Sequence, residues 1–322
     1  MRTAFVRSLM DVASLDPRVV LLTGDLGFAV LDEFRAKYPD RFYNVGVAEQ
    51  NLAGVAAGLA LAGNVVFTYS IGNFPTLRCL EQVRNDICYH NANVKIVTVG
   101  GGLAYGSLGV SHFAIEDLAI LRALPNITVV APGDPVEVTS LVPQIVEREG
   151  PAYLRLGRAG EKVVHDAGAQ ITLGHPARVR AGSGVLLLTT GGMLPVALDA
   201  AERLEHEGLD VEVVSVHTLK PLDAERICAL AARFPVVVTC EEHSAIGGLG
   251  GAVAEVLIEA GIAPTFRRFA LARDFPEGVG SQTYLRTANA LDAPALCELV
   301  LSLTAVRTAR SPQPRVAARR SG

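Results

Sequence analysis

Glu49 is the residue of this sequence whose type and position most clearly could do chemistry. It lies in the segment Gly46–Asn51, where an extended stretch ends, a turn follows and a helix predicted over Ala48–Ala62 begins. The rest of that helix is almost entirely small or apolar and carries no other charge, which predicts burial on all sides. The helix dipole alone favours a glutamate at this position. A carboxylate on a buried helix nevertheless needs a partner or acts on a bound group, so a structural and a functional interpretation both stand.

Three glycines and a histidine mark a second candidate region. Gly100, Gly101 and Gly102 follow a predicted strand, Val94–Val99, and open a polar loop that reaches His112. Glycines at the carboxyl end of a strand let a ligand approach the backbone in the usual crevice of an open α/β sheet. A lone histidine is most often structural, so His112 by itself does not identify a reaction.

Other motifs exclude several chemistries. Gly191-Gly192 and Gly247–Gly251 each follow a strand and open a helix, but neither completes a dinucleotide-binding fingerprint, and tight packing is the favoured interpretation. Gly106–Gly109 lacks the spacing of a hydrolase nucleophile elbow. The seven histidines are scattered and no two are three or four residues apart, so we expect no metal site in this chain.

The composition indicates a large globular protein. Of 322 residues, 50% are hydrophobic and 19% charged, which excludes a disordered chain or a coiled coil. A net charge of −4 provides no overall attraction for nucleic acid. Five cysteines without a Cys-x-x-Cys pair, and a start without an apolar signal core, predict a cytoplasmic protein with reduced thiols. Polar residues and glycines interrupt the uncharged stretch Asn51–Leu77, so we do not expect it to span a membrane.

The elements that must position these residues alternate between short apolar runs and helical segments. This pattern predicts an α/β fold of two successive three-layer domains, the first with a mainly parallel sheet and the second with a smaller, doubly wound, mainly parallel sheet. The expected boundaries are 1–160 for the first domain, 161–182 for a linker with one hairpin, and 183–304 for the second domain. Residues 305–322 carry five arginines and no acid, and a disordered basic tail is favoured over an arm that binds RNA or a partner.

Two predicted helices flank the regions of interest. Helical spacing indicates one continuous helix over Arg78–His90, directly after the uncharged stretch. A second helix over Ala288–Thr304 is expected to close the second domain.

Several segments carry a family resemblance. Tyr43–Asn51 resembles the segment of transketolases and their thiamine-diphosphate-dependent relatives that presents the catalytic glutamate. The resemblance continues in order and spacing through nearly everything before the tail. The further matching segments are Tyr69, Asn73–Arg78, Ser111-His112, Leu121–Asn126, Ala131–Asp134, Gly150–Arg158, Thr190–Gly192, Leu219–Asp223 and Glu241–Ser244. The last three look like the C-terminal domain of transketolases, particularly in its deoxyxylulose-phosphate synthase form.

The resemblance implies a pyrimidine-binding domain followed by a transketolase C-terminal domain. In such enzymes a preceding domain grips the cofactor diphosphate and its divalent metal through a Gly-Asp-Gly motif, which this sequence lacks. Split members of the family place that domain on a separate polypeptide. The resemblance therefore implies a C-terminal subunit that uses thiamine diphosphate, with Mg²⁺ or Ca²⁺ ligands on an N-terminal partner subunit. The implied assembly is an α2β2 heterotetramer that acts on sugar phosphates, with no nucleic-acid or membrane partner.

The resemblance also implies roles for individual residues near the pyrimidine ring. Glu49 matches the glutamate that hydrogen-bonds N1′ of the aminopyrimidine and promotes loss of the thiazolium proton. Phe74 would supply an aromatic surface near that ring, although as a lone phenylalanine it could equally be a core residue. Asn73 and Thr76 fall where transketolases often have phenylalanine, and His112 matches a histidine that faces the substrate.

A second group of matches concerns the substrate and the partner. Arg158 corresponds to an arginine that clamps the sugar phosphate, and Arg155 is the reserve candidate. Asp25 falls near a family position at the contact with the cofactor-binding subunit. Gly100 and Leu108 depart from the pattern, since many transketolases have a histidine and an aspartate there. Losing both polar contacts would alter discrimination by hydroxyl groups, so a specialised donor sugar is a hypothesis.

The reaction implied is transfer of a two-carbon ketol unit from a ketose donor, most simply a ketose phosphate, to an aldose acceptor. One alternative is the β subunit of a 2-oxoacid dehydrogenase or an acyloin-forming relative, which shares both domains and the glutamate. His112 and the Arg155–Arg158 neighbourhood favour a sugar phosphate over a 2-oxoacid. Another alternative is a non-catalytic structural subunit that has kept the fold, and the presence of Glu49 weighs against it.

Overall fold

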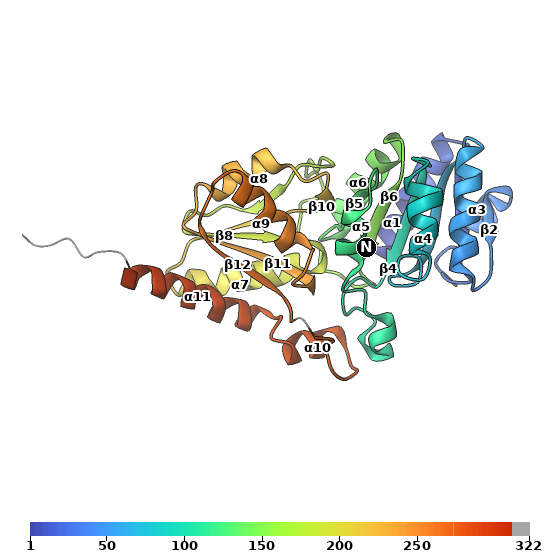
Figure 1. Ribbon diagram of the computed structural model, residues 1–322. Helices are drawn as coiled ribbons and strands as arrows, with labels where there is room; N and C mark the ends of the chain where they lie inside the picture. Colours follow the sequence, from blue (N-terminus) through green and yellow to red (C-terminus); the bar gives the residue numbers. More distant parts are fainter. Residues whose placement is uncertain (273, 311–322) are drawn as a thin grey trace, which may run out of the picture.

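Two α/β units lie next to each other along the long axis of the computed structural model, which describes residues 1–272 and 274–310 (Figure 1). The first unit contains α1 (Arg2–Leu15), β1 (Val19–Thr23), α2 (Asp32–Lys37), η1 (Pro39–Arg41), β2 (Phe42–Asn44), α3 (Glu49–Leu61), β3 (Val65–Ile71), α4 (Leu80–Gln82), the π-helix η2 (Val83–Cys88), β4 (Val94–Val99), η3 (Gly106–Leu108), η4 (Val110–His112), α5 (Asp117–Ala123), β5 (Thr128–Val130), α6 (Pro135–Glu147) and β6 (Ala152–Leu156). The second contains β7 (Ala177–Arg180), β8 (Val185–Thr189), η5 (Gly191–Met193), α7 (Leu194–His206), β9 (Val211–Ser215), β10 (Thr218–Lys220), α8 (Ala224–Ala231), β11 (Val236–Ser244), α9 (Leu249–Glu259), β12 (Thr265–Leu271), α10 (Gln282–Ala288) and α11 (Ala293–Arg310).

The first sheet has seven strands in the order β10-β5-β6-β4-β3-β1-β2. Neighbouring strands pair in parallel, except that β10 lies antiparallel to β5 at one edge. Strands such as β1 are continuous apolar runs because helices bury both of their faces. β10 comes from the second half of the chain, so it ties the second unit to the first sheet.

The second sheet has five strands in the order β12-β11-β8-β9-β7, of which only β7 is antiparallel to its neighbour. The chain passes from β8 to β9 in one direction and then to β11 and β12 in the other, which makes the sheet doubly wound. The predicted fold class, two α/β units with mainly parallel sheets, is confirmed. β7 lies within the range predicted as a linker, where it pairs with β9 of the second sheet and forms no hairpin of its own.

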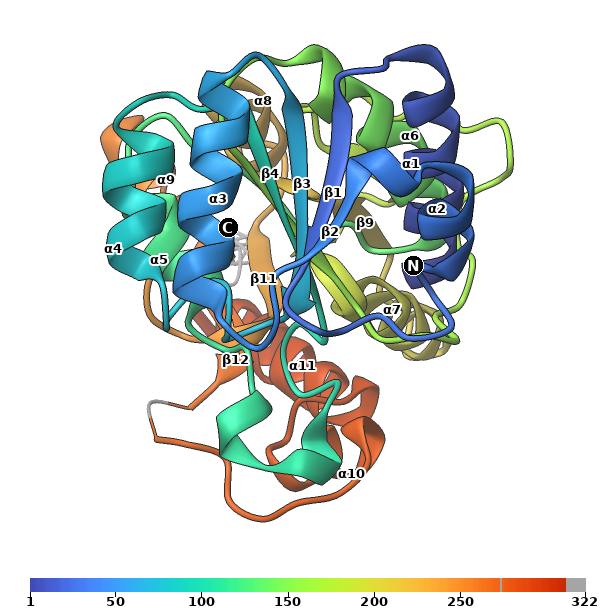
Figure 2. The same ribbon diagram turned by 90° about the vertical axis from the view of Figure 1, so that its right-hand side faces the viewer.

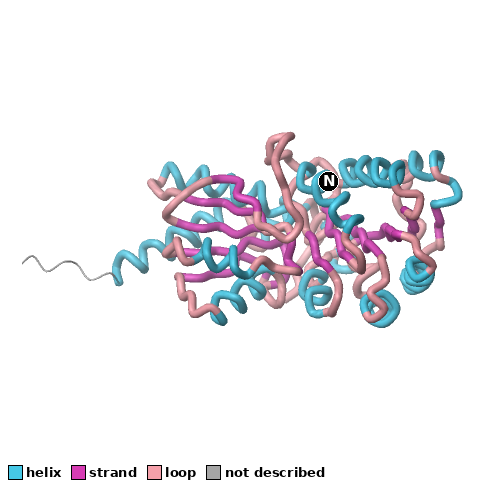
Figure 3. Tube along the Cα trace, turned by 90° about the horizontal axis from the view of Figure 1, so that it is seen from above, coloured by secondary structure: helices cyan, strands magenta, loops and turns pink. Residues whose placement is uncertain are grey.

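Helices cover both faces of each sheet. Figure 2 shows α1, α2 and α6 on one face of the first sheet and α3, α4 and α5 on the other. In the second unit α7 and α11 pack on one face, and α8 and α9 on the other. Figure 3, seen from above, shows the strands of both units enclosed by helices.

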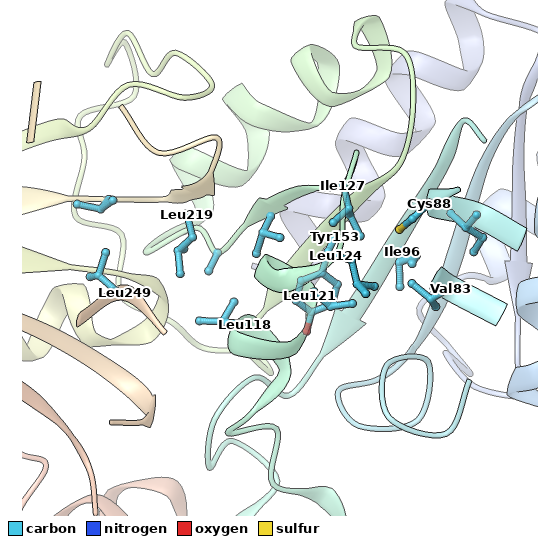
Figure 4. Packing of buried hydrophobic residues seen from close by; sticks show 14 of the residues in the cluster. Val83, Cys88, Ile96, Leu118, Leu121, Leu124, Ile127, Tyr153, Leu219 and Leu249 are labelled. Atoms are coloured by element: carbon cyan, nitrogen blue, oxygen red, sulfur yellow. The ribbon is translucent and has the colours of Figure 1, made fainter. Parts of the chain in front are cut away.

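One apolar core runs across the junction between the units. Leu118 and Leu121 of α5 lie between the core of the first sheet and two leucines of the second unit, Leu219 and Leu249 (Figure 4). All four side chains are almost completely buried. At about 25 cal/mol per Å² of apolar surface removed from water, such a shared core stabilises the two units against separation.

The helix predicted over Arg78–His90 is wrong in type and extent. Arg78 lies in a turn, α4 is only three residues long, and Val83–Cys88 forms a π-helix. In a π-helix each backbone hydrogen bond spans one more residue than in an α-helix, and such segments often occur at functional sites. The spacing of apolar residues does not reveal this change.

The helix predicted over Ala288–Thr304 is present as α11, but it begins at Ala293 instead of Ala288. α10 ends at Ala288, Ala290 takes a positive φ of 50°, and α11 starts at Ala293. α11 then continues to Arg310, so the first part of the predicted disordered tail over 305–322 is helical. The tail has no proline before Pro312, so nothing in its covalent chemistry stops the helix earlier. Residues 311–322 of the predicted tail lie outside the described residues.

The uncharged stretch Asn51–Leu77 folds into most of α3, strand β3 and a following turn. Within residues 1–272 and 274–310, none of the helices combines the length and the apolar character needed to cross a membrane.

Candidate active site

The candidate residues from the sequence gather at the carboxyl edge of the first sheet, where β1, β2, β3, β4 and β6 end. Glu49 follows β2 and begins α3, and its side chain is only 2% exposed. Its Oε2 accepts a hydrogen bond from Nη1 of Arg78 at 2.9 Å. A side chain on Gly24, at the end of β1, would bring a Cβ to within 3.9 Å of Glu49 Oε1, so that backbone lies beside the carboxylate.

The helix that carries Glu49 is not buried on all sides, contrary to the expectation from its composition. Leu52, Ala53 and other residues of the inward face pack on the sheet, whereas Gln50, Gly54 and Leu61 are exposed. One face of α3 is therefore free in the single chain, and it is the face that lacks charge.

Cys79 packs beside the carboxylate from the other side of the turn. Burial, together with the negative charge of Glu49, raises the pKa of the Cys79 thiol to about 12. The thiol donates to the carbonyl of Pro75 at 3.0 Å. Cys79 therefore stays protonated and acts as a packing residue rather than as a nucleophile.

Phe74 is the aromatic residue of the β3–α4 turn nearest to this carboxylate. The Arg78 guanidinium carbon lies 4.8 Å from the centroid of the Phe74 ring, so one arginine contacts both Glu49 and Phe74. Thr76 is completely buried and donates back to the carbonyl of Gly72. Of the three positions considered for a stacking residue, Phe74 thus places a half-buried ring next to Glu49's partner, whereas Thr76 turns into the protein.

Asn73 anchors this turn to the histidine loop. Its Nδ2 donates to the carbonyl of Phe113, while its buried Oδ1 has no hydrogen-bond partner among the described residues. An unsatisfied buried carbonyl is costly and is commonly met by a water or a ligand. Asn73 therefore offers one free acceptor beside Phe74.

His112 contacts Phe74 on the side of the histidine loop. Its ring meets the Phe74 ring edge-on with the centroids 5.2 Å apart, and it lies 6.5 Å from the Tyr105 ring. Its Nδ1 shares a hydrogen bond of 3.0 Å with Ser111 Oγ. Burial lowers the pKa of His112 below its usual value, which favours the neutral imidazole near pH 7.

Tyr105 is a residue that the sequence did not single out. A Cβ on Gly100 would lie 2.1 Å from Cδ2 of Tyr105, so the tyrosine ring fills the space that a side chain at position 100 would need. The Arg158 guanidinium lies 5.5 Å from the centroid of the same ring. Tyr105 therefore links His112 to Arg158. No spacing rule connects it to Gly100, because only the folded turn brings them together.

The two candidate arginines have different environments. Arg155 is 5% exposed, and its Nε donates to Asp117 Oδ2 at 2.8 Å while its Nη2 donates to the carbonyls of Ala114 and Glu242. Arg158 is exposed. Both line a cavity of about 230 Å³ between the two units. Arg158 thus has a guanidinium open to a ligand, whereas Arg155 is largely engaged in holding the junction.

Asp25 lies at the same sheet edge as Glu49, two residues after the end of β1. Its N–H donates to Asn44 Oδ1 at 3.0 Å, and Asn44 Nδ2 donates back to Asp25 Oδ1 at 2.8 Å. Asp25 takes a left-handed φ of 61°, a conformation that the reciprocal bonds support. The structure therefore brings Asp25, Glu49 and Phe74 to one edge.

The residues at this edge fit one half of a thiamine diphosphate site. A buried carboxylate, a half-buried aromatic ring and a free amide oxygen suit the polar rim and the faces of an aminopyrimidine. Within the part of the chain that the structure describes, no group of three or more His, Cys, Asp or Glu side chains is arranged to hold a metal ion.

Comparisons with known proteins match both units of the chain. Residues 1–160 match the family described as transketolase, pyrimidine binding domain, and residues 174–291 match transketolase, C-terminal domain. The chain is 39% identical over 294 residues to the 6-deoxy-6-sulfo-D-fructose transketolase subunit SqwH of Clostridium sp., covering 91% of each. It is 34% identical over 299 residues to an apulose-4-phosphate transketolase subunit of Actinobacillus succinogenes, covering 93% of this chain and 95% of that protein.

A solved structure is similar over the whole chain. The protein described as split gene transketolase, inactive beta4 tetramer, superposes with a TM-score of 0.85 at 39% identity, and the match covers 94% of this chain and 97% of that one. Both domain families and relatives of matching length thus agree. The chain belongs to the transketolase family, in which it corresponds to the C-terminal subunit of a split transketolase.

Proposed function

We propose that this chain is the C-terminal subunit of a thiamine-diphosphate-dependent transketolase, and that it is active only with an N-terminal partner subunit. The enzyme would transfer a two-carbon ketol unit from a ketose donor to an aldose acceptor. The observation that carries the proposal is the buried carboxylate of Glu49 at the carboxyl edge of a parallel sheet, where its partner Arg78 also contacts the Phe74 ring.

Glu49 would hold the proton at N1′ of the aminopyrimidine. Thiamine diphosphate, when bound, supplies the nucleophilic carbon that carries the two-carbon unit. The apolar surroundings of Glu49, which include Leu52 and Ala53, exclude water and so strengthen a shared hydrogen bond at the carboxylate. Phe74 would cover one side of the ring, and Asn73 would offer its free Oδ1 at the rim.

His112 and Arg158 would contact the sugar. His112 lies next to Phe74, and its neutral imidazole can donate a hydrogen bond to a sugar oxygen. Arg158 would hold the terminal anion of the donor, since its exposed guanidinium can form paired hydrogen bonds with a tetrahedral anion. Arg155 remains a secondary candidate for the anion, because most of its donors already have partners.

A partner subunit would complete the cofactor site. It would carry the Gly-Asp-Gly motif and the ligands of Mg²⁺ or Ca²⁺, with Asp25 near the subunit contact. The exposed face of α3 carries no charged side chain, which supports such a contact. Exposed surfaces that are contiguous and poor in charge often mark protein–protein interfaces. We propose an α2β2 heterotetramer in the cytoplasm.

The donor would be a specialised ketose rather than an ordinary pentose phosphate. Gly100 and Leu108 carry no polar group where many transketolases do, and the Tyr105 ring occupies the space beside Gly100. Two relatives are named for 6-deoxy-6-sulfo-D-fructose and for apulose 4-phosphate, and these names support the proposal of a specialised donor.

Reconstitution tests the proposal. The chain would be co-expressed with the product of a neighbouring reading frame that contains Gly-Asp-Gly, and the pair assayed with thiamine diphosphate, Mg²⁺ and a panel of ketose donors. We expect ketol transfer by the pair and none by this chain alone. Release of carbon dioxide from pyruvate would instead identify a 2-oxoacid dehydrogenase or acyloin-forming subunit. A strong preference for xylulose 5-phosphate would refute the specialised donor.

A further inference from the structure

The segment that carries His112 leaves its own sheet and packs on the second unit. It starts at Gly100–Gly102 after β4, forms η3 and η4, and lies against α10, as Figures 1 and 2 both show. His112 is the last residue of η4, and the only hydrogen bond of its ring within the described structure is to Ser111 of the same turn. The position of the imidazole therefore depends on what holds this segment.

Both ends of the segment are buried in the core of the second unit. Leu103 precedes the two turns and Phe113 and Ile115 follow them, and all three belong to the apolar cluster that contains Leu285 of α10. None of the four is more than 3% exposed. The N–H of Ser244, at the end of β11, also donates to the carbonyl of Ile115 at 2.8 Å. The second unit thus encloses the segment on both sides of His112.

The turn itself contacts α10 so closely that only glycine fits. The N–H of Gly280 donates to the carbonyl of Gly106 at 3.2 Å. A Cβ on Gly106 would lie 2.4 Å from Cδ1 of Leu285 and 2.7 Å from the carbonyl oxygen of Gly280. Those distances are below van der Waals contact, so close packing against the second unit explains the glycine.

A charged contact supports the start of the segment. Glu242 of β11 accepts hydrogen bonds from Nε and Nη2 of Arg286, both at 2.9 Å, and from Nε2 of Gln282 at 2.8 Å. The carboxylate is nearly buried and lies where a side chain on Gly102 would be, since a Cβ there would be 2.5 Å from Oε2. α10 therefore meets the segment at Gly106 directly and at Gly102 through Glu242.

We infer that the second unit positions His112 for the reaction, and that Leu285 and the Arg286–Glu242 pair are the positioning residues. This inference rests on the proposed contact of His112 with the substrate. None of these residues lies at the Glu49 edge, so they act on donor turnover rather than on cofactor binding. A misplacement of a substrate-contacting group by about 1 Å is enough to cost on the order of a hundredfold in rate.

Leu285→Ala in the reconstituted enzyme tests the inference against Leu296→Ala. Leu296 is equally buried in the same cluster, but its helix α11 packs on α7 and β11, whereas α10 contacts η3 of the histidine segment. Both variants therefore lose core packing. At a temperature below both unfolding midpoints, we expect Leu285→Ala to lower kcat/KM for the donor roughly ten- to a hundredfold, with half-saturation by thiamine diphosphate unchanged. Leu296→Ala should behave like the wild type, and Leu285→Met should restore most of the loss. Equal losses in both alanine variants would overturn the inference.

A double variant asks whether Leu285 acts through His112. If it does, Leu285→Ala should lower the activity of a His112→Ala enzyme little or not at all, because the group it positions is already gone. Full multiplication of the two losses would refute the inference.

The failure of the proposed role of His112 can be told apart from failure of the inference. If His112→Ala leaves donor kinetics unchanged, His112 does not contact the substrate. Positioning is then judged by the imidazole Cε1–H signal of His112, assigned by its loss in His112→Ala. We expect that signal to shift in Leu285→Ala and to stay in place in Leu296→Ala. An unmoved signal in Leu285→Ala would overturn the inference.

Discussion

Arg78 Nη1 lies 2.9 Å from Glu49 Oε2, so the carboxylate proposed to meet the aminopyrimidine already has a cationic partner in its own chain. The two residues differ in burial, since the glutamate side chain is 2% exposed and the arginine side chain 51%. The arginine also covers the ring of Phe74. A ligand that hydrogen-bonds to this carboxylate must therefore share it with Arg78 or displace Arg78 into solvent.

Arg78→Gln should reduce, by about 1 kcal/mol, the free energy of unfolding of the chain without its partner, because a buried carboxylate loses a charge-assisted hydrogen bond that water replaces only in part. Chemical denaturation would measure the change. In a Glu49→Gln background the same substitution should cost much less, since the charge that Arg78 pairs with is absent. Equal costs in both backgrounds would show that the pair contributes nothing to stability.

Glu49→Gln should lower kcat of the reconstituted enzyme by roughly 10²–10⁴, because the amide cannot exchange a proton with the pyrimidine nitrogen. The subunit should still fold and assemble, since glutamine keeps the size of the side chain. Circular dichroism and size-exclusion chromatography with the partner serve as controls. Unchanged turnover would leave the chain as a non-catalytic subunit that has kept the fold.

Arg158→Gln and Arg155→Gln should affect different properties, the first donor binding and the second stability. The first removes an exposed guanidinium and should raise the donor KM roughly ten- to a hundredfold with little change in unfolding midpoint. The second leaves buried Asp117 without its cation and should cost about 3–5 kcal/mol of stability. Steady-state kinetics and thermal unfolding of both variants decide the matter. A donor KM that responds only to Arg155 would transfer the anion contact to that residue.

Asp134 should make the stability of the chain depend on pH in the acid range. Burial opposes its charge, but hydrogen bonds from His165, and from the N–H groups of Glu137 and Val164, outweigh burial and lower the pKa of Asp134 to about 2. The folded-state pKa is below the unfolded value of 3.8, so this stabilisation is present above pH 3.8 and is lost as the pH falls towards 2. The free energy of unfolding, measured by denaturation at several pH values, should therefore fall with decreasing pH. This fall should be smaller in Asp134→Asn. An identical slope in the variant would contradict the assignment.

The fold class was predictable because local pattern carries it. Val94–Val99 is rich in valine and isoleucine, and it is a strand with the predicted bounds although Lys95 and Thr98 interrupt the apolar run. The helix predicted over Ala48–Ala62 is likewise present, as α3 over Glu49–Leu61. In each case the apolar residues repeat along the sequence with the spacing typical of that helix or strand. The sequence alone therefore contains the signal.

Other elements depended on distant contacts. Thr218–Lys220 leaves its own unit and adds an antiparallel strand to the first sheet, a pairing that no local pattern marks. The turn that contains Arg78, the short α4 and the π-helix that follows replaced a predicted helix. The left-handed backbone of Ala290 separates α10 from α11 and so moves the start of another predicted helix, although alanine favours helices.

By itself, the sequence determined which chemical groups exist and in what order they stand: a lone carboxylate at the start of an uncharged helix, glycines at a strand end, and two arginines three residues apart. Only the tertiary structure decided what surrounds them. It paired Glu49 with Arg78, buried Arg155 while leaving Arg158 exposed, filled the space beside Gly100 with Tyr105, and set His112 on the second unit. The reason is physical, because apolar periodicity is a property of neighbours along the chain, whereas burial and pairing arise between residues that only folding brings together.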